Sequence, residues 1–349
     1  MFVFITPLGA TMPVTMTATP SSLEKAAEIA DGLLFPTALA TDAAADVPVG
    51  HLDALAAAGL YGLAGPVDAG GMGVDAATAL GIIEILAGAC LTTTFVWIQH
   101  HSAVRAVVNS TPEVGDEWLA PLCRGQRRAG IAVAGIRPGN AGRAALTARA
   151  VDGGWLLRGV VPWVTGWGRV DVVHTAARNE AGDIVWALVD AIDSFTLSAE
   201  RTHLVAVEAS ATVVLHFDDH FVPAHRVTGI EDYEQWQARD AAGLRPNGSL
   251  ALGVAARCCR ILGPSGHDDE LVRCRAELDQ ASAETMPAAR AGASHLALRT
   301  AATLIAAGGS RAILMDHHGQ RLAREAMFLL VFASRPPIRT NLLQRLEEA

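Results

Sequence analysis

The sequence changes its periodicity twice, and this order of segments limits the fold more than any single motif does. From Ser22 to about Arg128, apolar residues recur every three or four positions, as on one face of a helix. Between about Ala129 and Thr228 the segments are short, rich in β-branched residues and separated by turn residues. After Glu231 the helical period returns and continues to the end. The chain is therefore predicted to be α+β, with an N-terminal helical domain, a central antiparallel β barrel or sandwich, and a C-terminal helical bundle.

These changes also divide the chain into domains. A length of 349 residues suits two or three domains rather than one core. We expect an N-terminal helical domain at 21–128, a β domain at 129–228 and a C-terminal helical domain at 229–349. Residues 1–20 are apolar but are interrupted by prolines and lack a basic start, unlike a signal peptide or a membrane span. A disordered leader is expected there.

Several elements can be placed from local signals. Helices are expected at Val49–Ala58, Ala76–Ala89 and Thr92–Val108, and strands at Ile131–Ile136, Leu146–Val151 and Trp155–Val164. The pair Asp152 and Gly153 lies between two of these strands, and both residue types tolerate positive φ, so a hairpin turn is predicted. Gly308 and Gly309 predict the end of a helix in the last domain.

The overall composition limits the partners. Hydrophobic residues make up 51% of the chain and charged residues 18%, and the formal net charge is −9. Such a composition predicts helix faces that are buried on several sides or against other subunits, so an oligomer is expected. The acidic balance provides no basic surface for nucleic acid or for an anionic membrane, and neither nucleic-acid binding nor membrane insertion is expected.

The cysteines indicate a reducing compartment. The five cysteines include no CxxC pair, and Cys258 and Cys259 are adjacent. This spacing suits neither a zinc site nor a set of disulfides. We therefore expect free thiols in a cytoplasmic protein and no metal site.

Four segments carry the strongest functional signal. They are an apolar helix followed by a Pro and a Gly-Gly-x-Gly loop (Leu55–Asp75), a hairpin with a Trp-x-Thr sequence (Trp155–Arg178), a strand that ends in Val-Pro (Val207–Gly229), and a Gly-Gly segment followed by Arg-x-x-Arg and an acid (Ala306–Phe332). No single segment is specific. Together, in this order and within the expected elements, they resemble the acyl-CoA dehydrogenase family over nearly the whole chain. The resemblance implies an FAD-dependent oxidoreductase that forms an α,β double bond in an acyl-CoA thioester. It also implies a homo- or hetero-oligomer, a dimer or tetramer.

The resemblance also implies which residues contact FAD. In the family the Trp-x-Thr segment lies beside the flavin, and here it corresponds to Trp163 and Thr165. On an extended segment these two side chains would point to the same side, where the indole could cover the ring and the hydroxyl could bond to a ring nitrogen. The alternative is a core tryptophan followed by a threonine in a turn.

Further cofactor contacts are implied at four other positions. They are Pro138, Gly308, Gly309 and Arg321. Pro138 belongs to a segment that resembles the family's Thr-Glu-Pro stretch, but Ile136 and Arg137 replace the Thr and the Glu, so only backbone N–H groups are left there to contact the flavin. The family's Arg-x-x-Phe-Gly turn, which holds the FAD diphosphate of a neighbouring subunit, is not evident after Gly263.

The family's catalytic base is a glutamate that removes the α-proton while the β-hydride passes to the flavin. The resemblance places this residue in a Tyr-Glu-Gly-like turn, which here corresponds to Phe332, Ala333 and Ser334. An alanine cannot accept a proton. In a minority of relatives the glutamate is on the first helix of the last domain, but the equivalent segment here has Asn247 and no acid. The usual base is therefore predicted to be missing.

Other groups could transfer the proton instead. His100 and His101 lie on a predicted helix whose counterpart lines the acyl pocket in relatives, and a neutral imidazole titrates in the useful range. Adjacent residues point about 100° apart on a helix, so only one of them could face the flavin. The alternative is a structural histidine pair. A carboxylate over the flavin, such as Glu208 or Glu325, would contradict the prediction of a missing base.

Three functions therefore stay open. The first is an acyl-CoA dehydrogenase-like oxidoreductase, either with an atypical base or as the non-catalytic subunit of a heteromer whose partner supplies the glutamate. The second is a flavin-dependent monooxygenase of the same fold, because a similar histidine-bearing helix occurs in that branch of the family. The third is a catalytically inactive acyl-CoA-binding or structural partner.

Overall fold

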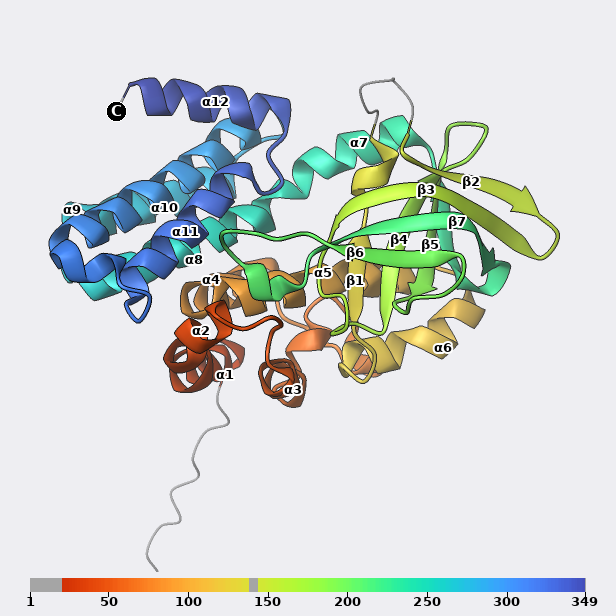
Figure 1. Ribbon diagram of the computed structural model, residues 1–349, viewed down its shortest axis with the longest axis horizontal. Helices are drawn as coiled ribbons and strands as arrows, with labels where there is room; N and C mark the ends of the chain where they lie inside the picture. Colours follow the sequence, from red (N-terminus) through yellow and green to blue (C-terminus); the bar gives the residue numbers. More distant parts are fainter. Residues whose placement is uncertain (1–20, 138–143, 349) are drawn as a thin grey trace, which may run out of the picture.

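The computed structural model describes residues 21–137 and 144–348, apart from the side chains of residues 241 and 242. The expected leader, residues 1–20, lies outside this part. Figure 1 shows a β-sheet on the right, a bundle of C-terminal helices on the left, and N-terminal helices that run below both. The predicted α+β class, with a helical domain, a sheet and a helical bundle in chain order, is confirmed.

The N-terminal helices follow the predicted periodicity. They are α1 (Ser22–Ile29), α2 (Phe35–Asp42), α3 (Val49–Ala57), α4 (Ala76–Ala89), α5 (Leu91–Val108) and α6 (Pro112–Cys123). Side chains at the helix starts supply acceptors for free backbone N–H groups: Ser21 and Glu24 form a capping box at α1, and Asp75 accepts from the Thr78 N–H at 2.7 Å at α4. The three helices predicted here are confirmed, each end within one residue.

The strands form one sheet with mostly antiparallel neighbours. They are β1 (Ala129–Ala132), β2 (Leu146–Val151), β3 (Gly154–Val164), β4 (Val172–Arg178), β5 (Ile184–Asp190), β6 (Leu197–Arg201), β7 (Val213–Pro223) and β8 (Val227–Glu231). Along the sheet the strand order is β6-β7-β3-β2-β4-β5-β8, and β1 pairs in parallel with β4. The predicted hairpin between β2 and β3 is confirmed, and Gly153 in its turn has a φ of 75°.

One predicted strand is wrong in its second half. The segment Ile131–Ile136 was expected to be extended throughout, but β1 ends at Ala132 and a 3-10 turn, η4 (Ala134–Ile136), follows. A Cβ atom on Gly135 would lie 2.9 Å from side-chain atoms of both Leu146 and Val161, so the turn packs directly onto the sheet. Packing in three dimensions therefore overrides the β propensity of this short apolar run.

The C-terminal helices complete the bundle. They are α7 (Tyr233–Ala242), α8 (Leu244–Leu262), α9 (Gly266–Gln280), α10 (Met286–Gly308), α11 (His318–Val331) and α12 (Pro336–Glu347). Helix α10 ends where the two glycines predicted it, and Gly309 has a φ of 59°. All five cysteines are buried and free. Within the described residues, no helix combines the length and the apolar character that crossing a bilayer requires.

Helices α4 and α8 approach each other closely and join the N-terminal helices to the bundle. A Cβ atom on Gly253 would lie 2.3 Å from the Glu84 carbonyl oxygen, and one on Gly88 would lie 2.6 Å from the Gly253 carbonyl oxygen. Only glycine fits at this crossing. The buried apolar residues of both helical parts consequently form one continuous core.

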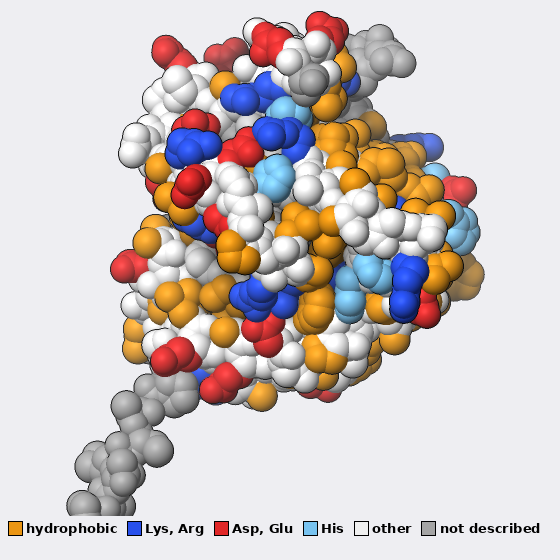
Figure 2. All heavy atoms as spheres, turned by 90° about the vertical axis from the view of Figure 1, so that its left-hand side faces the viewer, with side chains coloured by type: hydrophobic (Ala, Val, Ile, Leu, Met, Phe, Trp, Pro, Cys, Tyr) orange, Lys and Arg blue, Asp and Glu red, His pale blue; other side chains and the backbone are white. Residues whose placement is uncertain are grey.

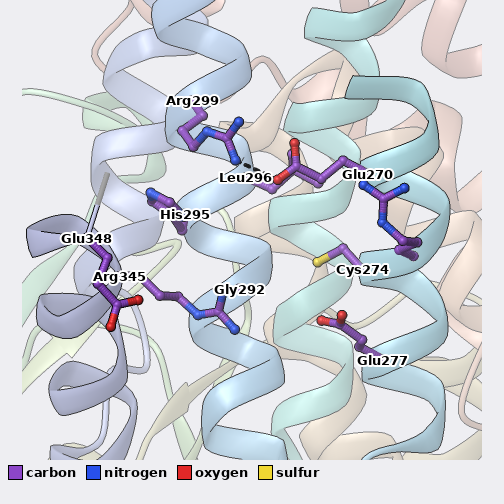
Figure 3. A pocket seen from close by; sticks show the side chains of 10 residues that line it. Glu270, Cys274, Glu277, Gly292, His295, Leu296, Arg299, Arg345 and Glu348 are labelled. Carbon is purple, nitrogen blue, oxygen red and sulfur yellow. Dashed lines mark hydrogen bonds and ion pairs between the residues drawn. The ribbon is translucent and has the colours of Figure 1, made fainter. Parts of the chain in front are cut away.

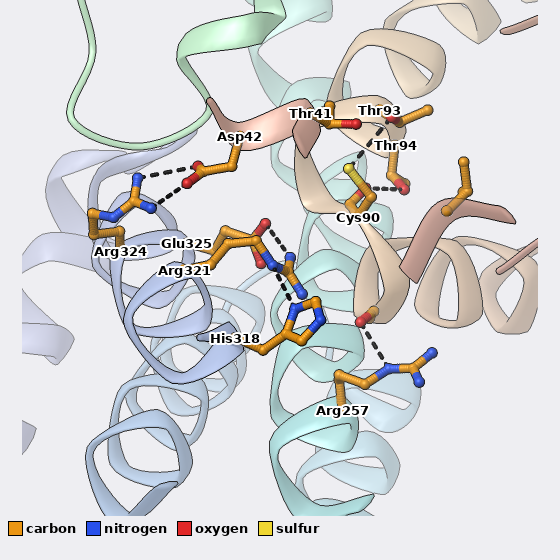
Figure 4. A network of polar contacts seen from close by, with 12 residues as sticks. Thr41, Asp42, Cys90, Thr93, Thr94, Arg257, His318, Arg321, Arg324 and Glu325 are labelled. Atoms are coloured by element: carbon orange, nitrogen blue, oxygen red, sulfur yellow. Dashed lines mark hydrogen bonds and ion pairs between the residues drawn. The ribbon is translucent and has the colours of Figure 1, made fainter. Parts of the chain in front are cut away.

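Helix α11 carries charged contacts on two sides (Figure 4). On its buried side, Arg321 Nη1 donates to Glu325 Oε1 at 2.6 Å, and the two side chains are 1% and 2% exposed. Burial raises the pKa of Glu325, and the Arg321 charge opposes this rise. Elsewhere on α11, Arg324 pairs with Asp42 of α2 and donates to the Val205 carbonyl oxygen at 2.9 Å. Helix α11 thereby joins the bundle to α2 and to the segment after β6.

Removing one charge of the buried Arg321–Glu325 pair should be costly. In Glu325→Gln the Arg321 guanidinium stays buried without an acid, and we expect the free energy of unfolding in urea denaturation to fall by about 3–5 kcal/mol. The double variant Arg321→Met/Glu325→Leu should lose much less, because no unpaired charge is left. The control is the exposed ion pair of Arg158 with Asp219, where Arg158→Gln should change stability by less than about 1 kcal/mol. A Glu325→Gln variant as stable as the wild type would refute this account.

Candidate functional site

The end of β3 is the first part of the candidate site. The pairing of β3 with β7 shifts register between Val161 and Val164, and Trp163, in this irregular stretch, has a φ of 66°. A non-glycine residue seldom adopts this conformation, which costs about 1–2 kcal/mol. Both valines are buried, whereas Trp163 is 61% exposed. A large flat apolar side chain is thus held in solvent, which suits a planar ligand that covers it.

Thr165 does not share the exposed side of Trp163, although simple strand alternation predicts that it would. Strand β3 ends at Val164, and the positive φ at Trp163 breaks the extended geometry. Thr165 is only 2% exposed, and its hydroxyl lies 3.5 Å from that of Thr212. The Thr212 hydroxyl also bonds to the Ser210 hydroxyl at 2.8 Å. The Thr165 hydroxyl is therefore part of a buried polar cluster with the hydroxyls of Thr212 and Ser210.

A tight loop after β6 packs against this end of β3. The Gly166 N–H donates to the Ser210 carbonyl oxygen at 2.8 Å, and the Trp167 N–H to the Ala211 carbonyl oxygen at 3.3 Å. Val207 and Ala211 have positive φ values of 53° and 50°. Together with the strained tryptophan, three non-glycine residues in a left-handed conformation belong to this one region. Strain of this kind is concentrated at functional sites in proteins.

Aromatic side chains join α5 to the end of α11. Phe95 of α5 contacts Phe328 and Phe332 edge-on, with ring centroids 5.1 Å apart in both pairs. Phe328 and Phe332 also stack on each other at 5.5 Å. Helix α5 packs against the 3-10 turn η5 (Glu208–Ser210) as well. This cluster therefore connects the end of α11 with the loop that meets β3.

An exposed apolar surface lies on α11 beside the same loop. Arg324, Met327 and Val331 share one face of the helix, because three and four residues separate them. Arg324 donates to the Val205 carbonyl oxygen, so this face adjoins Val205. Met327, Val331 and Val205 are all exposed. Apolar side chains on two adjoining segments suit an acyl chain or another apolar group.

The turn after α11 occupies the place where the resemblance implies a catalytic glutamate. Ala333 in this turn has a φ of 51°. Helix α10 holds the turn from below: the Ser294 hydroxyl donates to the Leu329 carbonyl oxygen at 2.8 Å, and Arg290 Nη2 donates to the Phe332 carbonyl oxygen at 3.5 Å. The backbone of the turn is thus fixed, while the side chain at position 333 is a methyl group.

The two acids considered as replacements serve local structure. Glu325 is buried and paired with Arg321. The Glu208 carboxylate accepts from the Leu204 N–H at 2.6 Å and lies 3.1 Å from His203 Nδ1. Each acid is therefore already engaged by groups of its own neighbourhood. The absence of a base at the family position stays a prediction from the sequence.

The histidine pair lies inside the protein. His100 Nε2 is 3.1 Å from the Leu122 carbonyl oxygen, and its Nδ1 accepts from the Ala129 N–H at 3.1 Å, so both nitrogens are engaged in one neutral tautomer. His101 contacts Trp97 edge-on at 4.6 Å, and neither of its ring nitrogens has a partner among the described residues. Burial lowers the pKa of His100 to about 3 and that of His101 well below its ordinary value. His100 thus holds α5 against α6 and β1, with no exposed surface for a substrate.

The other predicted cofactor residues are scattered. Arg321 is fully buried with Glu325, so no surface of its guanidinium is left for a diphosphate. Gly308 and Gly309 are exposed at the end of α10. Pro138 lies outside the described residues. The connection between α8 and α9 is three residues long, which leaves no space for the family's diphosphate-binding turn.

Sequence reasoning missed the strained backbone and one buried charge. The positive φ values at Val207, Ala211 and Ala333 have no signal in the sequence, since Val and Ala are poor residues for that conformation. Arg290 has no acid three or four residues away in the sequence. The sequence signal for its contact with the turn after α11 is weak: Arg290 is the one charged residue in the alanine-rich first turns of α10.

Two surface grooves lie away from this junction. One, of about 480 Å³, separates α9 from α10 and α12 (Figure 3). Its charged lining consists of Arg273, Arg299, Arg345, Glu270, Glu277 and Glu348, together with His295. Three arginines against three glutamates leave no net charge to attract an ion, and Arg299 already donates to Glu270 at 2.6 Å. The other, of about 720 Å³, lies between α6 and the sheet, where Arg226 pairs with Asp190 at 3.1 Å.

The part of the chain that the structure describes holds no group of three or more His, Cys, Asp or Glu placed to bind a metal ion.

Comparisons with known proteins agree with the fold described above. The family model described as acyl-CoA dehydrogenase, N-terminal domain, matches residues 21–126. The mitochondrial short-chain specific acyl-CoA dehydrogenase of Bos taurus is 27% identical over 212 residues, which are 58% of this chain and 51% of that protein. Benzylmalonyl-CoA dehydrogenase of Aromatoleum aromaticum is 28% identical over 239 residues, or 66% of this chain and 63% of that protein. The chain thus spans about half the length of the short-chain relative and somewhat more of the other.

A solved structure has the same fold. Glutaryl-CoA dehydrogenase from Mycobacterium smegmatis, in complex with FADH2, superimposes with a TM-score of 0.77 over 94% of each chain, at 17% identity. The order of helical domain, sheet and helical bundle is therefore the acyl-CoA dehydrogenase fold. The family match over residues 21–126, the two relatives and the shared fold together support the acyl-CoA dehydrogenase family for this chain.

His100 should make the stability depend on pH. Its pKa is about 3 in the folded protein and about 6.5 in the unfolded chain, so its contribution is present above about pH 6.5 and is lost as the pH falls towards 3. In urea denaturation, the difference in unfolding free energy between wild type and His100→Gln should shrink by about 2 kcal/mol between pH 7.5 and pH 5. Asn109→Ala removes no titratable group and is the control, with a constant difference. A constant difference for His100→Gln as well would contradict the buried neutral histidine.

Proposed function

We propose that the chain is an FAD-dependent, acyl-CoA dehydrogenase-like oxidoreductase that binds an acyl-CoA thioester where β3, the loop after β6 and α11 meet. The exposed indole of Trp163 on a strained backbone supports this proposal most directly, because the family's flavin lies beside the corresponding tryptophan. Few other roles account for the cost of holding a large apolar ring in solvent. FADH2 in a solved protein of the same fold supports the choice of cofactor.

The residues of the junction fit the ring end of the cofactor. Trp163 would cover one face of the isoalloxazine, and the buried hydroxyls below it would keep the loop in place. Val205, Met327 and Val331 would contact the acyl chain and exclude water from it. FAD, when bound, supplies an acceptor for the hydride that leaves the β-carbon.

The diphosphate end of the cofactor has a weaker fit within one chain. The three-residue connection between α8 and α9 offers no arginine turn, and Arg321 is buried. A second subunit would therefore have to supply this contact. Figure 2 shows apolar side chains among charged ones and histidines on the face that it draws. The C-terminal part of the chain has exposed apolar residues at Ile313, Leu314 and Met315 after α10 and at Val272 on α9. Exposed apolar residues on this scale support an oligomer.

We further propose that the base comes from outside this chain, from the partner subunit of a heteromer. Position 333 carries a methyl group in a fixed turn, and the two acids considered as replacements, Glu208 and Glu325, are engaged by their own neighbours. The monooxygenase alternative depended on His100 or His101 facing the flavin. His100 bonds to two backbone groups inside the protein, and no observation favours that alternative.

FAD binding is the first test of this function. We expect purified protein to be yellow, or to bind added FAD in titration calorimetry. Trp163→Leu should weaken binding about three- to tenfold, because about 1 kcal/mol of ring stacking is lost. Phe221→Leu, which removes another exposed aromatic residue from the same sheet, is the matched control and should bind FAD like the wild type. Colourless protein that does not bind added FAD would sink the proposed function.

Restoring an acid at position 333 tests the missing base. With FAD bound, wild-type protein alone should be reduced slowly or not at all by butyryl-CoA under anaerobic conditions. Ala333→Glu should bleach the flavin absorbance at least about tenfold faster, which is below the usual gain from a general base because nearby arginines would lower the glutamate pKa. Ala333→Gln, of the same shape without the acid, should stay slow. Rapid bleaching of the wild type would mean that the chain has its own base.

A further inference from the structure

Two arginines beside the turn after α11 share a single aspartate. Arg335, at the start of α12, donates to both Asp240 carboxylate oxygens, from Nε at 2.9 Å and from Nη2 at 2.8 Å. Arg137, in the loop after η4, donates to Asp240 Oδ2 at 2.8 Å and covers the Trp236 ring at 4.9 Å. Both arginine side chains are partly exposed, Arg137 at 30% and Arg335 at 26%. The sheet domain, α7 and the end of α11 thus meet at a pair of accessible guanidinium groups, and Figure 1 shows α7 reaching from the sheet towards the bundle.

A third arginine approaches the same turn from inside. Arg290 is 1% exposed, and no acid lies within ion-pair distance of it among the described residues. Its partners are the Ser294 hydroxyl and the Phe332 carbonyl oxygen, and its Nε has none. Burial lowers the pKa of Arg290 to about 10, so the guanidinium is still charged at neutral pH.

The charges around this turn do not balance. Arg137, Arg290 and Arg335 carry three positive charges, and Asp240 carries one negative charge, which leaves an excess of two. The carbonyl groups at the end of α11 offer Arg290 about half a negative charge at most. Buried or half-buried cations without a matching anion are costly, and a bound anion would offset this cost.

From this charge excess we infer that the acyl group of the substrate carries a carboxylate, which Arg335 and Arg137 bind at the turn that holds Ala333. The inference rests on the proposed function, because it assumes that the thioester lies at this turn. Arginine presents a planar fork that pairs with both oxygens of a carboxylate, and Lys would not do so. The phosphates of CoA are a second possible anion, but the pantetheine arm separates them from the acyl end of the ligand.

Two thioesters with acyl groups of four carbons test the inference. Succinyl-CoA and butyryl-CoA share the CoA phosphates and differ by the terminal carboxylate. In titration calorimetry on the FAD-loaded protein, we expect succinyl-CoA to bind at least tenfold more tightly than butyryl-CoA. Arg335→Gln and Arg137→Gln should each reduce this preference to less than about threefold, mainly by weakening succinyl-CoA. Arg339→Gln removes the same charge one helical turn further along α12 and should keep the preference.

The outcomes separate this inference from the proposed function. Equal binding of the two thioesters, or tighter binding of butyryl-CoA, would overturn the carboxylate while leaving the acyl-CoA site intact. Equal weakening of both thioesters in Arg335→Gln would show that the arginines bind a CoA phosphate, and the inference would again fail. Binding of neither thioester to FAD-loaded protein would overturn both the acyl-CoA site and the carboxylate.

Discussion

The contacts of Arg324 place α11 against α2 and the loop after β6, and the candidate site depends on that placement. The ion pair of Arg321 with Glu325 lies within α11 itself, four residues apart, and its burial shows which side of the helix faces the interior. With this side buried, Arg324 reaches Asp42 and the Val205 carbonyl oxygen. The loop after β6 is thereby brought to α11, and the same loop packs on the end of β3. One arginine of the bundle therefore links α11 to α2 and to the loop that packs on the end of β3.

The strained residues are stable because each is held from more than one side. Around Trp163 and Ala211, backbone hydrogen bonds from Gly166 and Trp167 tie the loop to the end of β3. At Ala333, the Ser294 and Arg290 side chains hold the end of α11. Each left-handed residue costs about 1–2 kcal/mol, which these contacts must offset. The result is a rigid junction whose exposed surface is apolar, as a preformed ligand site requires.

The periodicity of the sequence was enough to predict the fold but not the details of the site. Helices α4 and α5 and the β2–β3 hairpin have strong local signals and were predicted almost to the residue. The prediction for Trp163 and Thr165 assumed a regular strand, and a register shift at the end of β3 separates the two. Arg321 matched a motif, but it is buried beside the Phe35 ring of α2, a distant contact that no local pattern reports. Contacts between distant segments decide the site, and a single sequence does not contain them in readable form.

The predicted absence of the family's acid at position 333 and the excess of arginines around it have one explanation in the proposed function. A glutamate in this turn would lie next to Arg290 and Arg335, and their charges would lower its pKa and make it a weaker base. An uncharged residue there leaves the arginines free to attract an anion instead. Proton transfer would then fall to a group outside the chain, while this turn would contribute charge recognition. The strained backbone of Ala333 fits that division, because the turn is held in one conformation although its side chain has no proton to move.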